Sequence, residues 1–78
     1  MRTVVLYARA GCHLCDDARE IVLGVRASAP FAFEEIDIET SDALVRDYGV
    51  RIPVVTVDGE ELFEYSVDAA ALRAAVTV

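Results

Sequence analysis

Short apolar runs alternate along the chain with segments of helical periodicity. Val4-Val5-Leu6-Tyr7 is apolar on both faces, which is typical of a strand that is covered on both sides. After Gly11 the period changes, and apolar residues recur at helical spacing while charged residues occupy the other face. We expect Pro30 to end this helix by forcing Ala29 out of the helical conformation. The predicted inward-facing residues of the helix are Leu14, Ala18, Ile21, Val22 and Val25.

A second strand is predicted over residues 31–38, although its alternation is imperfect. Phe31 and Phe33 share one phase, whereas Ile36 and Ile38 share the other. Either a bulge or two differently covered faces would account for this pattern. Tyr7, Phe31 and Phe33 are expected in the core.

The second half of the chain predicts a hairpin between two helices. Pro53 can open a strand over residues 54–57, and Asp58-Gly59 is a strong two-residue turn signal before a return strand over residues 60–65. A short helix is expected from Thr40 or Ser41 through Tyr48, with Gly49 placed to end it. A last helix is expected to begin at Ser66 or Asp68, with Leu72 and Val76 facing inward.

The order of elements is therefore β-α-β-α-β-β-α, in one domain over residues 1–78. The first β-α-β unit requires a right-handed crossover between parallel strands, and the hairpin adds an antiparallel pair. This predicts an α/β fold with a four-stranded mixed sheet and helices on both faces, which resembles the minimal thioredoxin-like fold.

The composition narrows the range of partners. A hydrophobic fraction of 55% is too high for a disordered chain, and a net charge of −7 argues against nucleic acid and anionic membranes as partners. The apolar stretch near the N-terminus ends at Arg9 and is too short for a signal peptide or a bilayer span. We therefore expect a cytoplasmic protein, and a monomer.

Cys12 and Cys15, the two cysteines of the chain, are better suited to exchange than to stability. A bridge that closes so short a loop removes little entropy from the unfolded chain. Residues three apart within a helix have Cβ atoms about 5–6 Å apart, whereas a disulfide needs about 3.8 Å. At the start of the helix, where the backbone can adjust, the pair can open and close.

We predict that the pKa of the Cys12 thiol is moderately lowered. A helix dipole supplies about 0.3–1 kcal/mol, less than the ~1.4 kcal/mol that one pKa unit requires. Hydrogen bonds from the N–H groups of residues 13–15 and nearby cations must supply the rest, against the charges of Asp16 and Asp17. The candidate cations are His13, Arg9 and Arg51.

Other interpretations of these residues remain open. The cysteines could be small core residues, and His13, Arg9 and Arg51 could be solvated surface side chains. A zinc site would need a third or fourth ligand, and His13 is badly directed to join both thiolates. We expect neither a metal nor an organic cofactor.

Residues 7–16, Tyr-Ala-Arg-Ala-Gly-Cys-His-Leu-Cys-Asp, resemble the active-site segment of the small glutaredoxin-like proteins. The Gly-Cys-His-Leu-Cys-Asp part is similar to a bacterial branch of that family, and residues 51–54 resemble its cis-proline loop. The resemblance implies that Cys12 is the attacking thiolate and Cys15 the buried resolving thiol. It also implies a cis Pro53 near the sulfurs, Ile52 backbone groups that face an extended substrate, and Arg9 at the position of a glutathione contact.

The chain departs from that family where glutathione would bind. Glutaredoxins carry a Gly-Gly turn and an acidic pair there, and the aligned residues of this chain are Glu64, Tyr65, Val67 and Asp68. Of these residues, Asp68 alone fits the acidic pair of the family pattern, and the resemblance makes it a candidate substrate contact. An added charge, an added ring and the acidic net charge argue against glutathione as a co-substrate.

Together these features predict a thiol–disulfide oxidoreductase enzyme that reduces disulfides in proteins or small molecules. A cellular dithiol or a reductase would supply the electrons. The alternative is a thioredoxin-fold redox sensor or partner-binding module without turnover.

Overall fold

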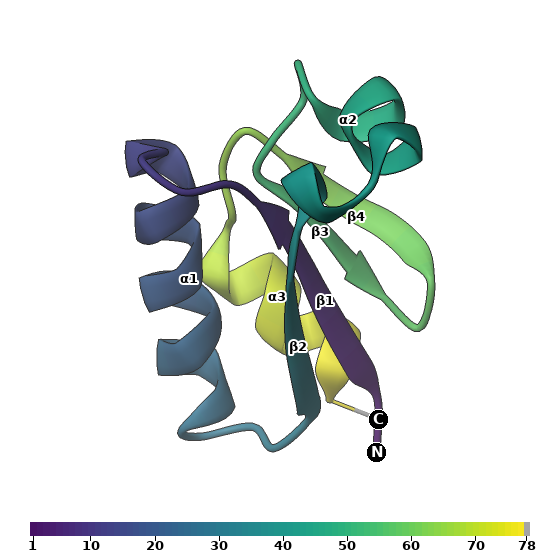
Figure 1. Cartoon of the computed structure of the whole chain (residues 1–78). Helices are drawn as coiled ribbons and strands as arrows, with labels where there is room; N and C mark the ends of the chain where they lie inside the picture. The colour runs from purple at the N-terminus through teal and green to yellow at the C-terminus, as the bar shows by residue number, and fades with distance from the viewer. Residues whose placement is uncertain (78) are drawn as a thin grey trace.

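The computed structural model describes residues 1–77 and follows the predicted order of strands and helices (Figure 1). Its elements are β1 (Thr3–Ala8), α1 (His13–Arg26), β2 (Ala32–Asp37), a 3₁₀ turn η1 (Ile38–Thr40), α2 (Asp42–Tyr48), β3 (Val54–Val57), β4 (Glu60–Glu64) and α3 (Ala69–Val76). No helix formed by these residues has both the length and the apolar content of a bilayer-spanning segment.

The sheet is mixed, with strand order β2-β1-β3-β4. β1 pairs in parallel with β2, while β1–β3 and β3–β4 are antiparallel. Asp58 and Gly59 join β3 to β4 with φ values of 51° and 86°, and a two-residue hairpin turn requires such positive values. The predicted α/β fold with a mixed four-stranded sheet is confirmed.

The Asp58 carboxylate also ties this hairpin to the N-terminus of the chain. It accepts hydrogen bonds from the Thr3 N–H at 2.9 Å and from the Arg2 guanidinium at 2.7 Å. These bonds, the Thr3 bond first, hold the pKa of Asp58 below its ordinary value of 3.8.

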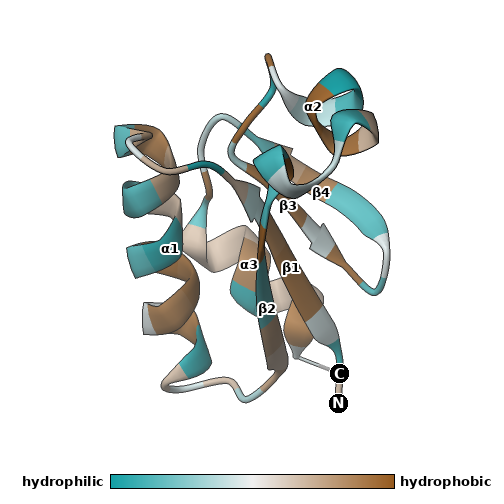
Figure 2. Ribbon diagram, in the orientation of Figure 1, coloured by the Kyte–Doolittle hydropathy of each residue, from teal (hydrophilic) through white to brown (hydrophobic). Residues whose placement is uncertain are grey.

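The main core lies between one face of the sheet and helices α1 and α3. Figure 2 shows hydrophobic residues along β1 and on the side of α1 that faces the sheet, with hydrophilic residues on its outer side. On the opposite face of the sheet, Tyr7 stacks on Tyr48 of α2, with ring centroids 4.3 Å apart. Helices therefore cover both faces, as predicted. The core residues are Val4, Leu6, Ala8, Cys15, Ala18, Val22, Val25, Phe31, Val55, Val57, Val67, Leu72 and Val76.

The first helix differs from its prediction at both ends. Leu14 is 52% exposed, and Cys15 takes the buried position in that turn, because residues 15, 18, 22 and 25 form the inward stripe. The helix ends at Arg26, before the boundary expected from Pro30. Beyond it, the N–H groups of Ser28 and Ala29 both donate hydrogen bonds to the Val25 carbonyl. The prediction for Leu14 was wrong because Cys15 was not counted among the apolar residues.

The second strand owes its uneven alternation to its two faces. β2 pairs with β1 in unbroken register, so it contains no bulge. Phe33 lies opposite Val4 and packs against the main core, whereas Ile36 lies opposite Tyr7 on the other face. The one register shift of the described sheet falls instead between Val55 and Thr56, where β3 meets β4.

Two predicted helix ends are confirmed, and the structure shows the conformation of one and the capping residue of the other. Gly49 ends α2 with a right-handed φ of −52°, so it does not supply a left-handed cap. A Cβ at this position would overlap the carbonyl oxygen of Val45. At α3, Asp68 rather than Ser66 is the cap, and its carboxylate accepts the N–H of Ala71 at 3.1 Å.

Candidate functional site

Three loops meet at one end of the sheet. Tyr7 near the end of β1 pairs with Val54 at the start of β3, so residues 9–12 leave the sheet beside the point where residues 49–53 enter it. The Tyr65 N–H donates to the Pro53 carbonyl at 2.8 Å, which brings residues 65–68 to the same place (Figure 1). The ends of β1, β3 and β4 therefore frame a common site.

Cys12 and Cys15 form a disulfide at this site, with Cα atoms 5.2 Å apart. Cys12 precedes α1 in an extended conformation, with φ −95° and ψ 110°, so the pair does not lie within regular helix. Cys15 is fully buried in the core, whereas Cys12 is half-buried at its edge. The expected burial of Cys15 is confirmed, and Cys12 is the more accessible of the two cysteines.

One backbone N–H group reaches the Cys12 sulfur. The Cys15 N–H donates to Cys12 Sγ at 3.2 Å, while the bonds expected from the N–H groups of His13 and Leu14 are not formed within residues 1–77. His13 is exposed in the first turn of α1. In the disulfide state, one of the three predicted N–H bonds to the Cys12 sulfur is therefore present.

Arg9 lies in the loop before the cysteines with an unsatisfied donor. Its Nε is buried and finds no hydrogen-bond partner among residues 1–77, and the Glu39 carboxylate is 3.9 Å from it. Arg9 lines a cavity of about 280 Å³ together with residues of α1 and β2, which include Asp16, Arg19 and Glu35. It stays a candidate contact for an acidic group of a substrate.

Asp16 forms an ion pair with Arg19, a contact that the sequence did not predict. Arg19 donates to Asp16 at 2.9 Å and makes two bonds of 2.6 Å to Glu35 of β2. The bonds to Glu35 and then Asp16 raise the pKa of Arg19. Asp16 is thus partly neutralised and opposes a Cys12 thiolate less than an isolated carboxylate would.

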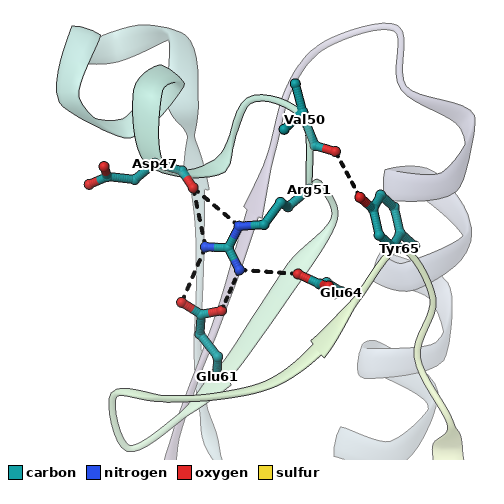
Figure 3. Close-up of polar contacts among 6 residues, drawn as sticks. All are labelled: Asp47, Val50, Arg51, Glu61, Glu64 and Tyr65. Atoms are coloured by element: carbon teal, nitrogen blue, oxygen red, sulfur yellow. Dashed lines mark hydrogen bonds and ion pairs between the residues drawn. The ribbon is translucent and has the colours of Figure 1, made fainter.

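Arg51 connects the loop before Pro53 to two neighbouring elements. Its guanidinium donates to Glu61 at 2.7 Å, to Glu64 at 3.1 Å and to the Asp47 carbonyl at 3.2 Å (Figure 3). It also lies over the Tyr48 ring, 5.2 Å from the centroid. The bond from Arg51 lowers the pKa of Glu61. The structure therefore places Arg51 in an ion-pair network with β4, a position that the sequence did not predict.

The Ile52–Pro53 peptide bond is cis, as the resemblance implied. Pro53 is buried and Ile52 is half-buried. Within the part of the chain that the structure describes, the peptide groups of Ile52 form no backbone hydrogen bond. They remain free to pair with an extended substrate.

Tyr65 and Asp68 occupy the third loop. Tyr65 has a left-handed φ of 70°, and its hydroxyl donates to the Val50 carbonyl at 3.0 Å (Figure 3). The Asp68 carboxylate is engaged at the start of α3, as described above, and is exposed. Among residues 1–77, no three His, Cys, Asp or Glu side chains converge as metal ligands would.

Comparison with known proteins agrees with this geometry. Residues 3–77 match the family model described as a glutaredoxin-like domain (DUF836). An uncharacterized protein of Mycobacterium tuberculosis is 33% identical over 76 residues, covering 91% of this chain and 78% of its own length.

Solved structures of similar proteins share the fold of this chain. A protein of X. campestris is 40% identical to this chain with a TM-score of 0.76, and the match covers 91% of both chains. A protein of Nitrosomonas europaea is 31% identical with a TM-score of 0.84, and the match covers 97% of this chain and 92% of that protein. A mutant thioredoxin of Halobacterium salinarum is 25% identical with a TM-score of 0.70, and the match covers 96% of this chain and 71% of the thioredoxin.

Proposed function

The chain belongs to the glutaredoxin-like domain family, and on this premise we propose that it is a thiol–disulfide oxidoreductase that works through Cys12 and Cys15. One observation carries the proposal: a disulfide at a helix N-terminus joins a half-buried sulfur to a fully buried one. Family membership and the thioredoxin-like fold support redox chemistry at this pair.

The reaction that we propose is a pair of thiol–disulfide exchanges. The Cys12 thiolate attacks a substrate disulfide, one substrate sulfur leaves as a thiolate, and a mixed disulfide forms. The Cys15 thiolate then attacks Cys12 Sγ, which releases the second substrate thiol and forms the Cys12–Cys15 disulfide. The substrate gains two electrons and the protein loses two, which a cellular dithiol or a reductase must restore.

The surroundings of the pair support this order of attack. Cys12 receives the Cys15 N–H, and Arg19 partly neutralises Asp16 in the same turn, so both contacts favour a thiolate at Cys12. The free peptide groups of Ile52 suit an extended substrate beside Cys12. We propose a disulfide-containing protein or small molecule as substrate, no metal or organic cofactor, and a monomer that acts in the cytoplasm, where thiols are kept reduced.

The test is reduction of insulin disulfides by dithiothreitol in the presence of the wild-type protein and of two cysteine variants. Cys12→Ser should abolish the acceleration. Reduced Cys15→Ser, freed of dithiothreitol and then mixed with insulin, should accumulate a mixed disulfide with the substrate. Ala10→Ser, in the same loop, introduces a hydroxyl without removing a thiol and serves as the matched control. Full activity in Cys12→Ser would refute the proposed mechanism.

A redox sensor without turnover is the second candidate. The observation in its favour is that, in the disulfide state, one N–H group rather than three reaches the Cys12 sulfur. A thiolate that kept this one bond alone would be only weakly activated. A sensor would accelerate insulin reduction no more than the same concentration of added dithiothreitol does. Its affinity for a partner would instead change between the oxidised and reduced states.

A further inference from the structure

Tyr65 holds a backbone conformation that favours glycine. Its φ of 70° lies in the left-handed region, where a Cβ crowds the following carbonyl oxygen. Residues kept in such conformations cluster at ligand-binding positions, and the surrounding contacts hold them there. Tyr65 follows β4 directly and reaches the Pro53 carbonyl, so it borders the site that contains Cys12.

Hydrogen bonds at both ends fix the orientation of the Tyr65 side chain. The backbone N–H donates to the Pro53 carbonyl at 2.8 Å, and the phenol hydroxyl donates to the Val50 carbonyl at 3.0 Å. The ring therefore lies alongside residues 50–53 (Figure 3). Because the hydroxyl proton is already used, the 49% of the residue that remains exposed offers mainly apolar ring surface.

Two other exposed apolar residues lie on the segments that meet at this end of the sheet. Val50 is 87% exposed in the loop before Pro53, and Leu14 is 52% exposed in the first turn of α1, next to Cys15. The carboxylate of Glu64, the acidic neighbour of Tyr65, accepts a hydrogen bond from Arg51. Exposed apolar side chains are therefore present on each of the three segments that meet at the end of the sheet where Cys12 and Ile52 lie.

We propose that Tyr65 is a specificity-determining residue for protein disulfides. Its ring contacts an apolar side chain beside the reacting cysteine of an extended polypeptide, whose backbone pairs with Ile52. Glutathione offers two carboxylates and no apolar side chain, so it gains nothing from the ring. The proposal rests on the proposed oxidoreductase function and names the substrate class that this site selects.

Two probes test the selectivity, both with dithiothreitol as the common reductant. One is a disulfide between two copies of a short peptide with leucine on each side of its cysteine, and the other is glutathione disulfide. In each case Cys12 attacks one sulfur, two substrate thiols are released, and dithiothreitol is oxidised to its cyclic disulfide. The measurement is the ratio of kcat/KM for the peptide to kcat/KM for glutathione disulfide.

Tyr65→Gly should lower this ratio about tenfold, because it removes the ring while glycine accepts the backbone conformation. Tyr65→Phe keeps the ring, loses the bond to Val50, and should retain the wild-type ratio. Leu62→Ser, which changes an exposed apolar residue in the middle of β4, controls for general surface hydrophobicity and should leave the ratio unchanged.

An unchanged ratio in Tyr65→Gly would overturn the proposal, as would an equal fall in Tyr65→Phe. Absence of turnover by the wild-type protein would instead refute the proposed oxidoreductase function. In that case the selectivity of the site is measured instead as the rate at which each probe forms a mixed disulfide with Cys12 in a Cys15→Ser background. That step needs the Cys12 thiolate alone, and equal effects of Tyr65→Gly on both probes would overturn the proposal.

Discussion

Adding one methyl group at Gly49 is expected to destabilise the protein and to displace the loop that leads to Pro53. A Cβ at Gly49 would overlap the carbonyl oxygen of Val45. The same carbonyl accepts the Gly49 N–H at 2.8 Å, so the two groups cannot separate without weakening the bond that ends α2. The clash is with backbone, which cannot rotate away as a flexible side chain could.

The expected loss of unfolding free energy in Gly49→Ala follows from three contributions. Overpacking of this kind costs about 1–3 kcal/mol, and loss of the hydrogen bond adds about 0.5–1.5 kcal/mol. Alanine restricts the unfolded chain more than glycine does, which offsets about 0.4–1 kcal/mol. The net loss is therefore about 0.5–4 kcal/mol, and Tm should fall by roughly 4–8 °C for each kcal/mol lost in a domain of this size.

Gly24→Ala is the matched control, because it makes the same chemical change with the opposite expected sign. Gly24 lies within α1, and a Cβ there meets no atom within 4 Å. Alanine should stabilise the helix by about 0.5–1 kcal/mol, which raises Tm by a few degrees.

Thermal unfolding followed by circular dichroism measures both variants, and insulin reduction well below each Tm measures the site. Gly49→Ala should lose activity while it is still folded, because Val50 to Pro53 follow the displaced residue, whereas Gly24→Ala should keep it. A Tm for Gly49→Ala at or above the wild-type value would refute the reasoning.

Two further predictions concern charged residues. Asp58→Asn should lower stability at neutral pH and flatten its acid dependence. The lowered pKa of Asp58 means that its contribution is present above pH 3.8 and is lost as pH falls through the folded-state pKa. Urea unfolding at neutral pH and at about pH 2 tests this against Asp17→Asn, and an equal loss from Asp58→Asn at both pH values would contradict it. Arg19→Met should raise the pKa of the Cys12 thiol, because it leaves the Asp16 charge unpaired beside it. The pH midpoint of Cys12 alkylation in a Cys15→Ser background measures the shift, and a midpoint that stays constant or falls would disprove this role.

The sequence predicted most of the backbone because its signals are local. The Asp58-Gly59 turn and the apolar stripes depend on neighbours a few residues away, and they place the strands and helices correctly. The error at Leu14 is also local, because Cys15 is apolar enough to take the buried position in the first turn of the helix and leaves Leu14 exposed.

The electrostatic surroundings of the site could not be predicted in the same way. Arg51 meets Glu61 and Glu64 because β4 folds back beside it, and Arg19 meets Glu35 because β2 lies next to α1. These partners are 10 to 16 residues apart in sequence, and nothing in the spacing of charges selects them from the other carboxylates. Tyr65 was recognised as a bulky departure from the family pattern, but its bond to Val50 depends on the fold.

Both outer strands of the sheet carry rows of carboxylates, and this affects how separate molecules meet in solution. A strand edge has unpaired peptide groups that can template pairing with another chain. Here β2 and β4 are the two edges, and each presents three acidic side chains. Glu35, Glu61 and Glu64 are paired with arginines, so the repulsion comes mainly from Glu34, Asp37 and Glu60, which make no ion pair within residues 1–77. Copies that approach edge to edge at neutral pH repel one another, so the protein should stay dispersed at high concentration. Acid that protonates these carboxylates should allow the edges to join, and aggregation should then begin from the sheet. The acidic residues are Glu34, Glu35 and Asp37 on β2 and Glu60, Glu61 and Glu64 on β4.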